Sequence, residues 1–174
     1  MGGAYQLSEI TADLIEMSIR SNIAAALANV RSQRLDPTVT TEVPKEYFQY
    51  EAAHVYRAPA IFTIIKDQTP RDSIMGANHV NMMSDVVVAV VIEDRLARLL
   101  VKKSYRYQAA LFQLLHQTTL TTADDSVRLF LRVQNMQFSG VINLKNAKAS
   151  DAVFRKEVSL RLQVEHIENL EVLV

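Results

Sequence analysis

The segment 151–168, DAVFRKEVSLRLQVEHIE, alternates between apolar and polar side chains for about fifteen residues. A period of two indicates a β-strand, because successive side chains of a strand point to opposite faces. At roughly 3.3 Å per residue such a strand spans about 50 Å, whereas a common strand spans about 17–20 Å. The apolar row is Phe154, Val158, Leu160, Leu162 and Val164, and the polar row is Arg155, Glu157, Ser159, Arg161, Gln163 and Glu165. The chain therefore has to build a long sheet with one buried face and one polar face.

Periodicity along the rest of the chain predicts two main helices and three further strands. The expected elements are a helix over 8–30 with Ser8 as N-cap, a strand over 58–66, a strand over 80–94, a helix from Asp94 to about Gln117, a strand over 126–138 and the closing strand. The order α-β-β-α-β-β predicts an α+β fold, with a central, mostly antiparallel β-sheet of about four or more strands and two main helices packed on it.

The chain of 174 residues is expected to form one domain, residues 1–174. Prolines break the pattern over 31–57, which is expected to be an irregular insertion, with a short helix starting at Pro44. Two polar segments, 67–79 and 139–152, are expected to be long loops, the second with an optional small hairpin.

The expected core combines the helical stripes with the apolar strand residues. The first helix contributes Ile10, Leu14, Ile15, Met17, Ile19, Ile23, Ala24, Ala26, Leu27 and Val30, and the second contributes Leu96, Leu100, Tyr107, Leu111 and Leu114 or Leu115. The strand over 80–94 is apolar on both faces, which is typical of a central or covered strand.

The amino-acid composition argues against several classes of function. The 19 basic and 19 acidic residues cancel, so nothing favours tight binding to nucleic acid phosphates. The absence of cysteine excludes disulfides, thiolate catalysis and thiolate metal sites. There is neither a signal-peptide pattern nor an apolar run long enough to span a membrane, so we expect an intracellular, soluble protein without a membrane partner.

The sequence offers no catalytic pattern. The four histidines are far apart and form no helical pair, so ordinary surface or half-buried roles are favoured over a metal site. The acidic pairs Glu93-Asp94 and Asp124-Asp125 flank element ends and favour capping or turn roles over acid–base catalysis. The basic, tyrosine-containing segment 102–108 is interpreted as Tyr107 facing the core while Lys102, Lys103 and Arg106 stay in solvent. We therefore expect no enzyme activity, no cofactor and no metal.

Several segments together resemble the tail terminator and tail-completion proteins of tailed bacteriophages. They are the first helix, "APAIF", "DVVVAVVIED", "YRYQAALFQLL" and "FRKEVSLRLQVEHIE", and the resemblance covers roughly residues 8–168. The resemblance implies a virion structural protein, made and assembled in the host cytoplasm. It would form a homohexameric ring that caps the tail tube, stops its polymerisation and joins the tail to the head–tail connector, while DNA passes through the ring without specific binding.

Within that picture, one polar row and two loops are the candidate contact sites. Arg155, Glu157, Arg161 and Glu165 are expected to face the channel or the adjacent subunit. An exposed row of this kind makes register-specific contacts, and a ring repeats the same heterologous contact at every interface. The expected partner-contact residues of the loops are Arg71, Met75, Asn78, Asn143, Lys145 and Lys148.

Three alternatives remain open from the sequence. The chain can be another neck, head–tail connector or tail-completion component on the same fold. It can be a small non-viral α/β binding module that is monomeric or dimeric. It can also be an enzyme whose site is assembled from scattered polar residues.

Overall fold

The computed structural model describes residues 4–33, 36–50, 57–71, 79–144 and 152–169. Its elements, in chain order, are α1 (Ala4–Ser32), β1 (Glu46–Phe48), β2 (Ala60–Pro70), β3 (His79–Asp94), α2 (Ala97–Leu115), β4 (Thr118–Thr121), β5 (Val127–Phe138), β6 (Ile142–Leu144) and β7 (Val153–Asn169). Neither described helix is long and apolar enough to cross a membrane.

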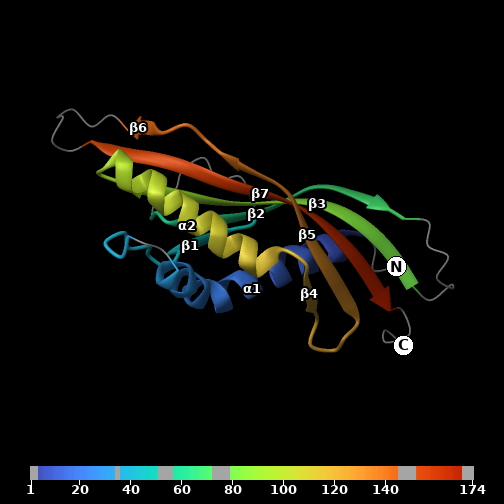
Figure 1. Ribbon diagram of the computed structural model, residues 1–174. Helices are drawn as coiled ribbons and strands as arrows, with labels where there is room; N and C mark the ends of the chain where they lie inside the picture. Colours follow the sequence, from blue (N-terminus) through green and yellow to red (C-terminus); the bar gives the residue numbers. More distant parts are fainter. Residues whose placement is uncertain (1–3, 34–35, 51–56, 72–78, 145–151, 170–174) are drawn as a thin grey trace.

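All seven strands belong to one sheet (Figure 1). Their order is β1-β2-β3-β7-β5-β4, and the short β6 pairs with the beginning of β7. Every pairing is antiparallel except that of β1 with β2, which is parallel. The predicted α+β class and the mostly antiparallel sheet are confirmed, and the sheet contains more strands than the sequence pattern revealed.

The two central strands are long and pair along their whole length. β3 has 16 residues and β7 has 17, in register from His79 opposite Asn169 to Asp94 opposite Phe154. At about 3.3 Å per residue β7 spans roughly 55 Å, so the long closing strand is confirmed. The prediction that the strand over 80–94 is central is confirmed too, because β3 lies between β2 and β7.

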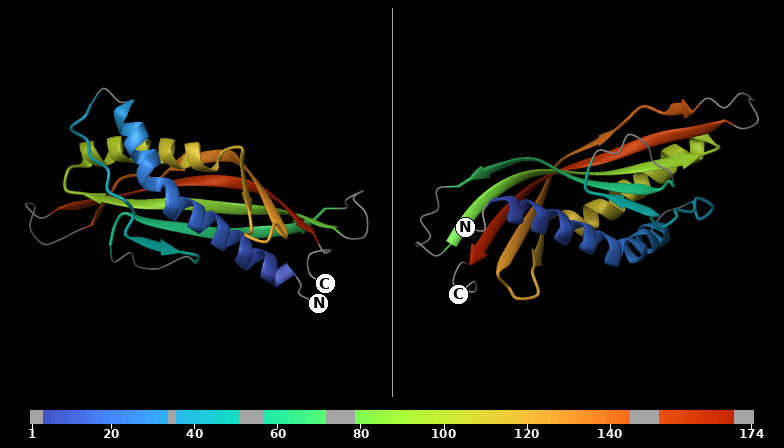
Figure 2. Two further views of the ribbon diagram at one scale, coloured as in Figure 1. Left: turned by 90° about the horizontal axis from the view of Figure 1, so that it is seen from below. Right: turned by 180° about the vertical axis from the view of Figure 1, so that it is seen from behind.

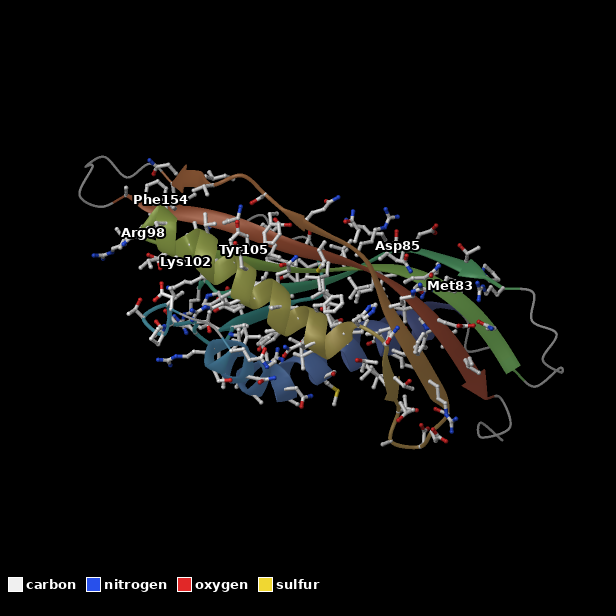
Figure 3. The ribbon with its side chains drawn as sticks, in the orientation of Figure 1. Met83, Asp85, Arg98, Lys102, Tyr105 and Phe154 are labelled. Carbon is white, nitrogen blue, oxygen red and sulfur yellow. The ribbon has the colours of Figure 1, made fainter. Side chains whose placement is uncertain are left out.

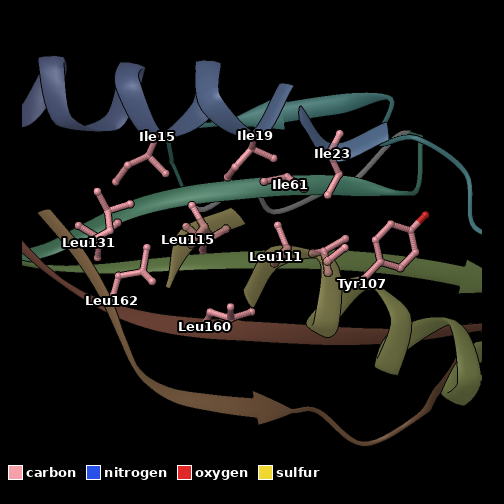
Figure 4. Packing of buried hydrophobic residues seen from close by; sticks show 14 of the residues in the cluster. Ile15, Ile19, Ile23, Ile61, Tyr107, Leu111, Leu115, Leu131, Leu160 and Leu162 are labelled. Atoms are coloured by element: carbon pink, nitrogen blue, oxygen red, sulfur yellow. The ribbon is translucent and has the colours of Figure 1, made fainter. Parts of the chain in front are cut away.

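Both helices pack on the same face of the sheet, which leaves the other face without a helix in the described structure (Figure 2). The core lies between these two layers (Figure 4): Ile15, Ile19 and Ile23 of α1 are fully buried, as are Leu160 and Leu162 of β7. Each such side chain stabilises the fold by about 1.5–3 kcal/mol relative to exposure. The apolar row of the closing strand therefore packs against the two helices.

The first helix differs from expectation at its start and on one side. It begins at Ala4, so Ser8 is inside the helix and is not its N-cap. The Ser8 hydroxyl instead donates to the Gln68 side chain of β2. Met17 and Ala24 are exposed, because the helix turns its isoleucine row, rather than their row, toward the sheet.

The second helix begins later than predicted. Leu96 is the N-cap residue and is 54% exposed, so its assignment to the core was wrong, whereas Leu100, Tyr107, Leu111 and Leu115 are fully buried as expected. Asp94 is not the cap itself, but its carboxylate accepts a hydrogen bond from the Leu96 backbone N–H at 2.9 Å.

The segment before β2 also differs from expectation. The helix expected after Pro44 is replaced by β1, in which Tyr47 and Phe48 pair with Ile61 and Phe62 of β2. Pairing with β2 overrides the local preference. The part of the segment before β1 is fixed to α2, because Arg106 donates to the carbonyl oxygens of Asp36 and Val39.

Two predicted loops are shorter than expected because their flanks are strand. Residues 67–70 belong to β2 and pair with 82–85 of β3, and His79 already belongs to β3, while residues 72–78 lie outside the described residues. Ile142–Leu144 form β6, which pairs with Val153–Arg155 of β7. This pairing agrees with the small hairpin that the sequence analysis gave as an alternative for this segment. β4, which pairs with the start of β5, was not predicted.

Candidate functional site: the open face of the sheet

The sheet face opposite the helices is the candidate functional surface, and we call it the open face. Odd-numbered residues of β3 and β7 point toward it, because even-numbered residues such as Val88 and Leu160 are buried under the helices. Figure 3 shows polar side chains standing above this face, with Asp85 near its middle. The polar row predicted from the sequence therefore lies on one surface, as expected.

A polar groove of about 420 Å³ crosses the open face, and a second one of about 340 Å³ adjoins it. Both are bordered by Asp85, Asn135 and Arg161. Two strand irregularities flank them, where the register shifts by one residue at Lys66 of β2 and at Gln134 of β5. Such bulges redirect side chains and are frequent beside functional surfaces. The grooves are shallow and lined mainly by amide, hydroxyl and charged groups.

Arg161 is bound to β3 of the same chain. Its Nε lies 2.8 Å from Oδ1 and 2.9 Å from Oδ2 of Asp85, and its Nη2 donates to Oδ2 as well. Asp85 stands diagonally across from Arg161 in the β3–β7 ladder. The hydrogen bonds that Arg161 donates to Asp85 raise the pKa of its guanidinium, so this arginine is a cation paired with a carboxylate of its own chain.

Arg155 is bound in the same way. It stands directly opposite Glu93 of β3, and its Nε donates to Glu93 Oε1 at 2.8 Å. Both side chains are largely screened from solvent by their neighbours. The register of β3 against β7 thus supplies a carboxylate for each arginine within the chain, and the expectation that this row faces the channel or the adjacent subunit stays a prediction.

The two acidic candidates of the row differ from each other. Glu165 accepts from Asn81 at 3.3 Å and from Arg71 at 3.4 Å, so the loop candidate Arg71 contacts the row itself. Glu157 is exposed, and its carboxylate has no hydrogen-bond or ion-pair partner among the residues that the structure describes. The row is therefore brought together as predicted, and Glu157 is its one described member with a free charge.

Of the other loop candidates, the structure describes one. Asn143 is exposed in the middle of β6, opposite Phe154. Met75, Asn78, Lys145 and Lys148 lie outside the described residues.

Asp85 and Glu93 are site residues that the sequence reasoning missed. Both stand at odd positions of the valine-rich strand, the side that proved to face away from the helices. Acidic residues on an otherwise apolar strand were an available signal. Their partners were hidden, because register between strands more than sixty residues apart cannot be read from spacing.

The open face is not polar throughout. Near β1 it carries an apolar cluster in which Ala60, Phe62, Ala89 and Val91 are buried. The Phe48 ring stacks on Phe62 with a centroid distance of 5.0 Å. The polar grooves and the apolar cluster thus occupy different parts of the open face along β2 and β3.

Groups that suggested chemistry have structural roles in the described part of the chain. Glu93 and Asp94 pair with Arg155 and Lys103, which agrees with roles at element ends. The Asp124 carboxylate accepts hydrogen bonds in the β4–β5 turn from the side chain of Ser126, at 2.7 Å, and from its backbone N–H. Hydrogen bonds from Thr122 and Ser126 lower the pKa of Asp124 to about 2.

Two further expectations about polar residues need correction. Arg106 was expected in solvent but is buried, because its guanidinium holds the backbone before β1. Tyr107 is fully buried as expected, and its hydroxyl donates to the Glu42 carbonyl. His166 was expected at the surface or half-buried, but it is fully buried between α1 and the sheet. No group of three or more potential metal-binding side chains converges among the described residues.

Comparison with known proteins adds little. No protein-family model matches the chain, and no curated protein matches it. One solved structure with a similar chain is the "virion of native gene transfer agent (GTA) particle". The alignment covers 88% of this chain and 93% of that chain, with 13% sequence identity and a TM-score of 0.39. A match at this level assigns no family.

Proposed function

We propose that this chain is a virion structural protein that forms a homohexameric ring, a tail terminator of a tailed bacteriophage. In this role it caps the tail tube, stops its polymerisation and joins the finished tail to the head–tail connector. The proposal builds on the resemblance of the sequence segments to that protein class. The observation that carries it is the open face, a long sheet surface without a helix over its described part, on which the two arginines of β7 are paired with carboxylates.

A conduit for DNA needs a surface that does not hold phosphate. Each cation that neutralises a phosphate adds affinity through counterion release, so free arginines would retain the DNA. On the open face Arg155 and Arg161 are paired with Glu93 and Asp85, which leaves Arg132 of β5 as an exposed arginine without a partner among the described residues. The free carboxylate of Glu157 adds weak repulsion. These features support a role as a lining surface rather than as a nucleic acid binder.

Sheet dimensions also favour assembly over a small-molecule function. The grooves of the open face are shallow and mostly polar, unlike the concave and largely apolar sites that bind cofactors or substrates. A sheet with strands of 16 and 17 residues instead offers a broad, stiff surface. Such a surface suits a ring wall, in which the same contact recurs at every subunit boundary.

Two measurements test the proposal. Native mass spectrometry and electron microscopy of the purified chain should show six-membered rings, free or on the end of tail tubes. The chain should also stop elongation when it is added to the tube protein of the same phage during polymerisation, so that tube length decreases as its concentration rises. A chain that stays monomeric, caps no tube and leaves tube length unchanged would overturn the proposal. Rings that bind the head connector but not the tube would instead identify another neck component.

A further inference from the structure

The beginning of α2 carries positive charge that the described part of the chain does not neutralise. Arg95 and Arg98 are both exposed and have no hydrogen-bond or ion-pair partner among the described residues. The next two lysines differ, since Lys102 pairs with Asp36 and Lys103 with Asp94. We call Arg95 and Arg98 the basic stripe; Arg98 is labelled in Figure 3.

The position of the basic stripe is unfavourable for the isolated helix. The amino end of a helix carries partial positive charge, so cations there cost stability. α2 has no acidic residue in its first turn and no side chain that caps it. Cations at the amino end of a helix that no carboxylate of the described chain neutralises are candidates for a role in binding.

The first half of α1 carries the opposite charge. Glu9, Asp13 and Glu16 follow one another at spacings of four and three, which places them on one side of the helix. Glu16 pairs with Arg20 at 2.8 Å, and the one described donor to the Asp13 carboxylate is the neutral Gln49 amide, at 2.7 Å. Glu9 is exposed without a described partner. We call Glu9 and Asp13 the acidic stripe.

The two stripes lie at opposite ends of the helical layer. α1 begins at the end of the molecule where β7 finishes, and α2 begins at the other end, as the views in Figure 2 show. One molecule therefore cannot join its own stripes. Each stripe also has an exposed apolar neighbour, with Leu96 54% and Tyr105 52% exposed beside the basic stripe and Met17 62% exposed beside the acidic one.

We infer that the basic stripe of one copy binds the acidic stripe of the next copy. The occupant is a second copy because the complementary charge, with matching apolar neighbours, is present on the same chain at the far end. A contact between two different patches of identical subunits is heterologous, and it generates a closed ring when the rotation closes. The inference rests on the proposed ring and names the surfaces that would build it.

Charge reversal in both directions tests the contact. Arg95→Glu with Arg98→Glu makes both stripes acidic, and Glu9→Arg with Asp13→Arg makes both basic. Neither variant should assemble alone, and the concentration needed for assembly should rise at least about tenfold. An equimolar mixture should assemble again as an alternating ring, because each acidic surface then meets a basic one.

The controls separate this contact from folding defects and from other partners. Arg31→Glu reverses an exposed arginine of α1 that lies outside both stripes and outside the open face, and it should assemble like the wild type. Circular dichroism should show all variants folded. Normal assembly of both stripe variants, with wild-type rings present, would overturn the inference and leave the ring intact. Loss of duplex DNA retention in the basic-stripe variant, with assembly unchanged, would assign the stripe to phosphate binding instead. A wild type that never assembles would overturn both proposals.

Discussion

His166 of β7 accepts a hydrogen bond from Ser84 of β3, with 2.6 Å between Nε2 and Oγ, and both residues are fully buried. The other imidazole nitrogen lies 2.9 Å from Thr11 Oγ1 of α1. Thr11 gives its own hydroxyl proton to the Leu7 carbonyl at 2.6 Å, so Nδ1 has to be the donor to Thr11. The ring is therefore a neutral Nδ1–H tautomer whose Nε2 is an acceptor.

This histidine predicts how stability depends on pH. Burial lowers the pKa of His166 from 6.5 to about 4 in the folded chain. Between these pH values the unfolded chain takes up a proton that the folded chain does not. The contribution of His166 to the free energy of unfolding is therefore complete above about pH 6.5 and is lost as the pH falls toward 4. The expected loss is about 3 kcal/mol in the free energy of unfolding. Urea titrations at a series of pH values measure it.

The matched variant is His166→Gln, which retains a donor and an acceptor but cannot titrate. The variant should lose less stability than the wild type between pH 6.5 and 4, although other acids titrate in both. Parallel curves for the two proteins would show that His166 is not the group responsible.

Val88 and its neighbour Val87 test which face of β3 is buried. Val88 is fully buried under the helices, and Val87 lies half-buried beside the smaller groove on the open face. Val88→Asp should cost about 4 kcal/mol or more because it buries an unpaired charge, whereas Val87→Asp should cost about 1 kcal/mol. Thermal melts of both variants give the comparison. Equal losses would contradict the assigned faces.

The Arg155–Glu93 pair can be tested by exchanging its charges. Arg155→Glu alone places two carboxylates opposite each other and should cost about 1 kcal/mol. Adding Glu93→Arg in the same chain should restore most of that loss. A double-mutant cycle on the monomer, in denaturant, measures the coupling. An absence of coupling would contradict the prediction that this pair stabilises the folded chain.

Arg106 is expected to hold the segment before β1 against α2. Removing its side chain in Arg106→Ala should cost about 1–3 kcal/mol, because the carbonyls of Asp36 and Val39 lose a charged donor. Arg106→Lys should recover only part of this, since an ammonium group lacks the planar fork that reaches two carbonyls. Hydrogen exchange should accelerate in residues 36–43 of both variants. Unchanged exchange in the alanine variant would argue against this anchoring role.

Sequence periodicity predicted the central strands because alternation over 153–165 and the valine run of β3 are local properties. The core side of β7 followed directly from which residues are apolar. The polar row was predicted for the same reason, and the structure places its four charged candidates on one face. The short strands β1 and β4 were missed and β6 was predicted only as an optional small hairpin, since three or four residues carry too little pattern and depend on a partner strand.

Only the tertiary structure decided which residues from distant segments contact each other. Register across β3 and β7 gives Arg155 and Arg161 carboxylate partners at Glu93 and Asp85, which the sequence pattern did not reveal. Burial of His166 and Arg106 likewise depends on segments that fold over them from elsewhere in the chain. A sequence fixes the side chains and their local periodicity, but the pairing of distant segments is settled by the packing of the whole sheet and helix layer, which no single segment encodes.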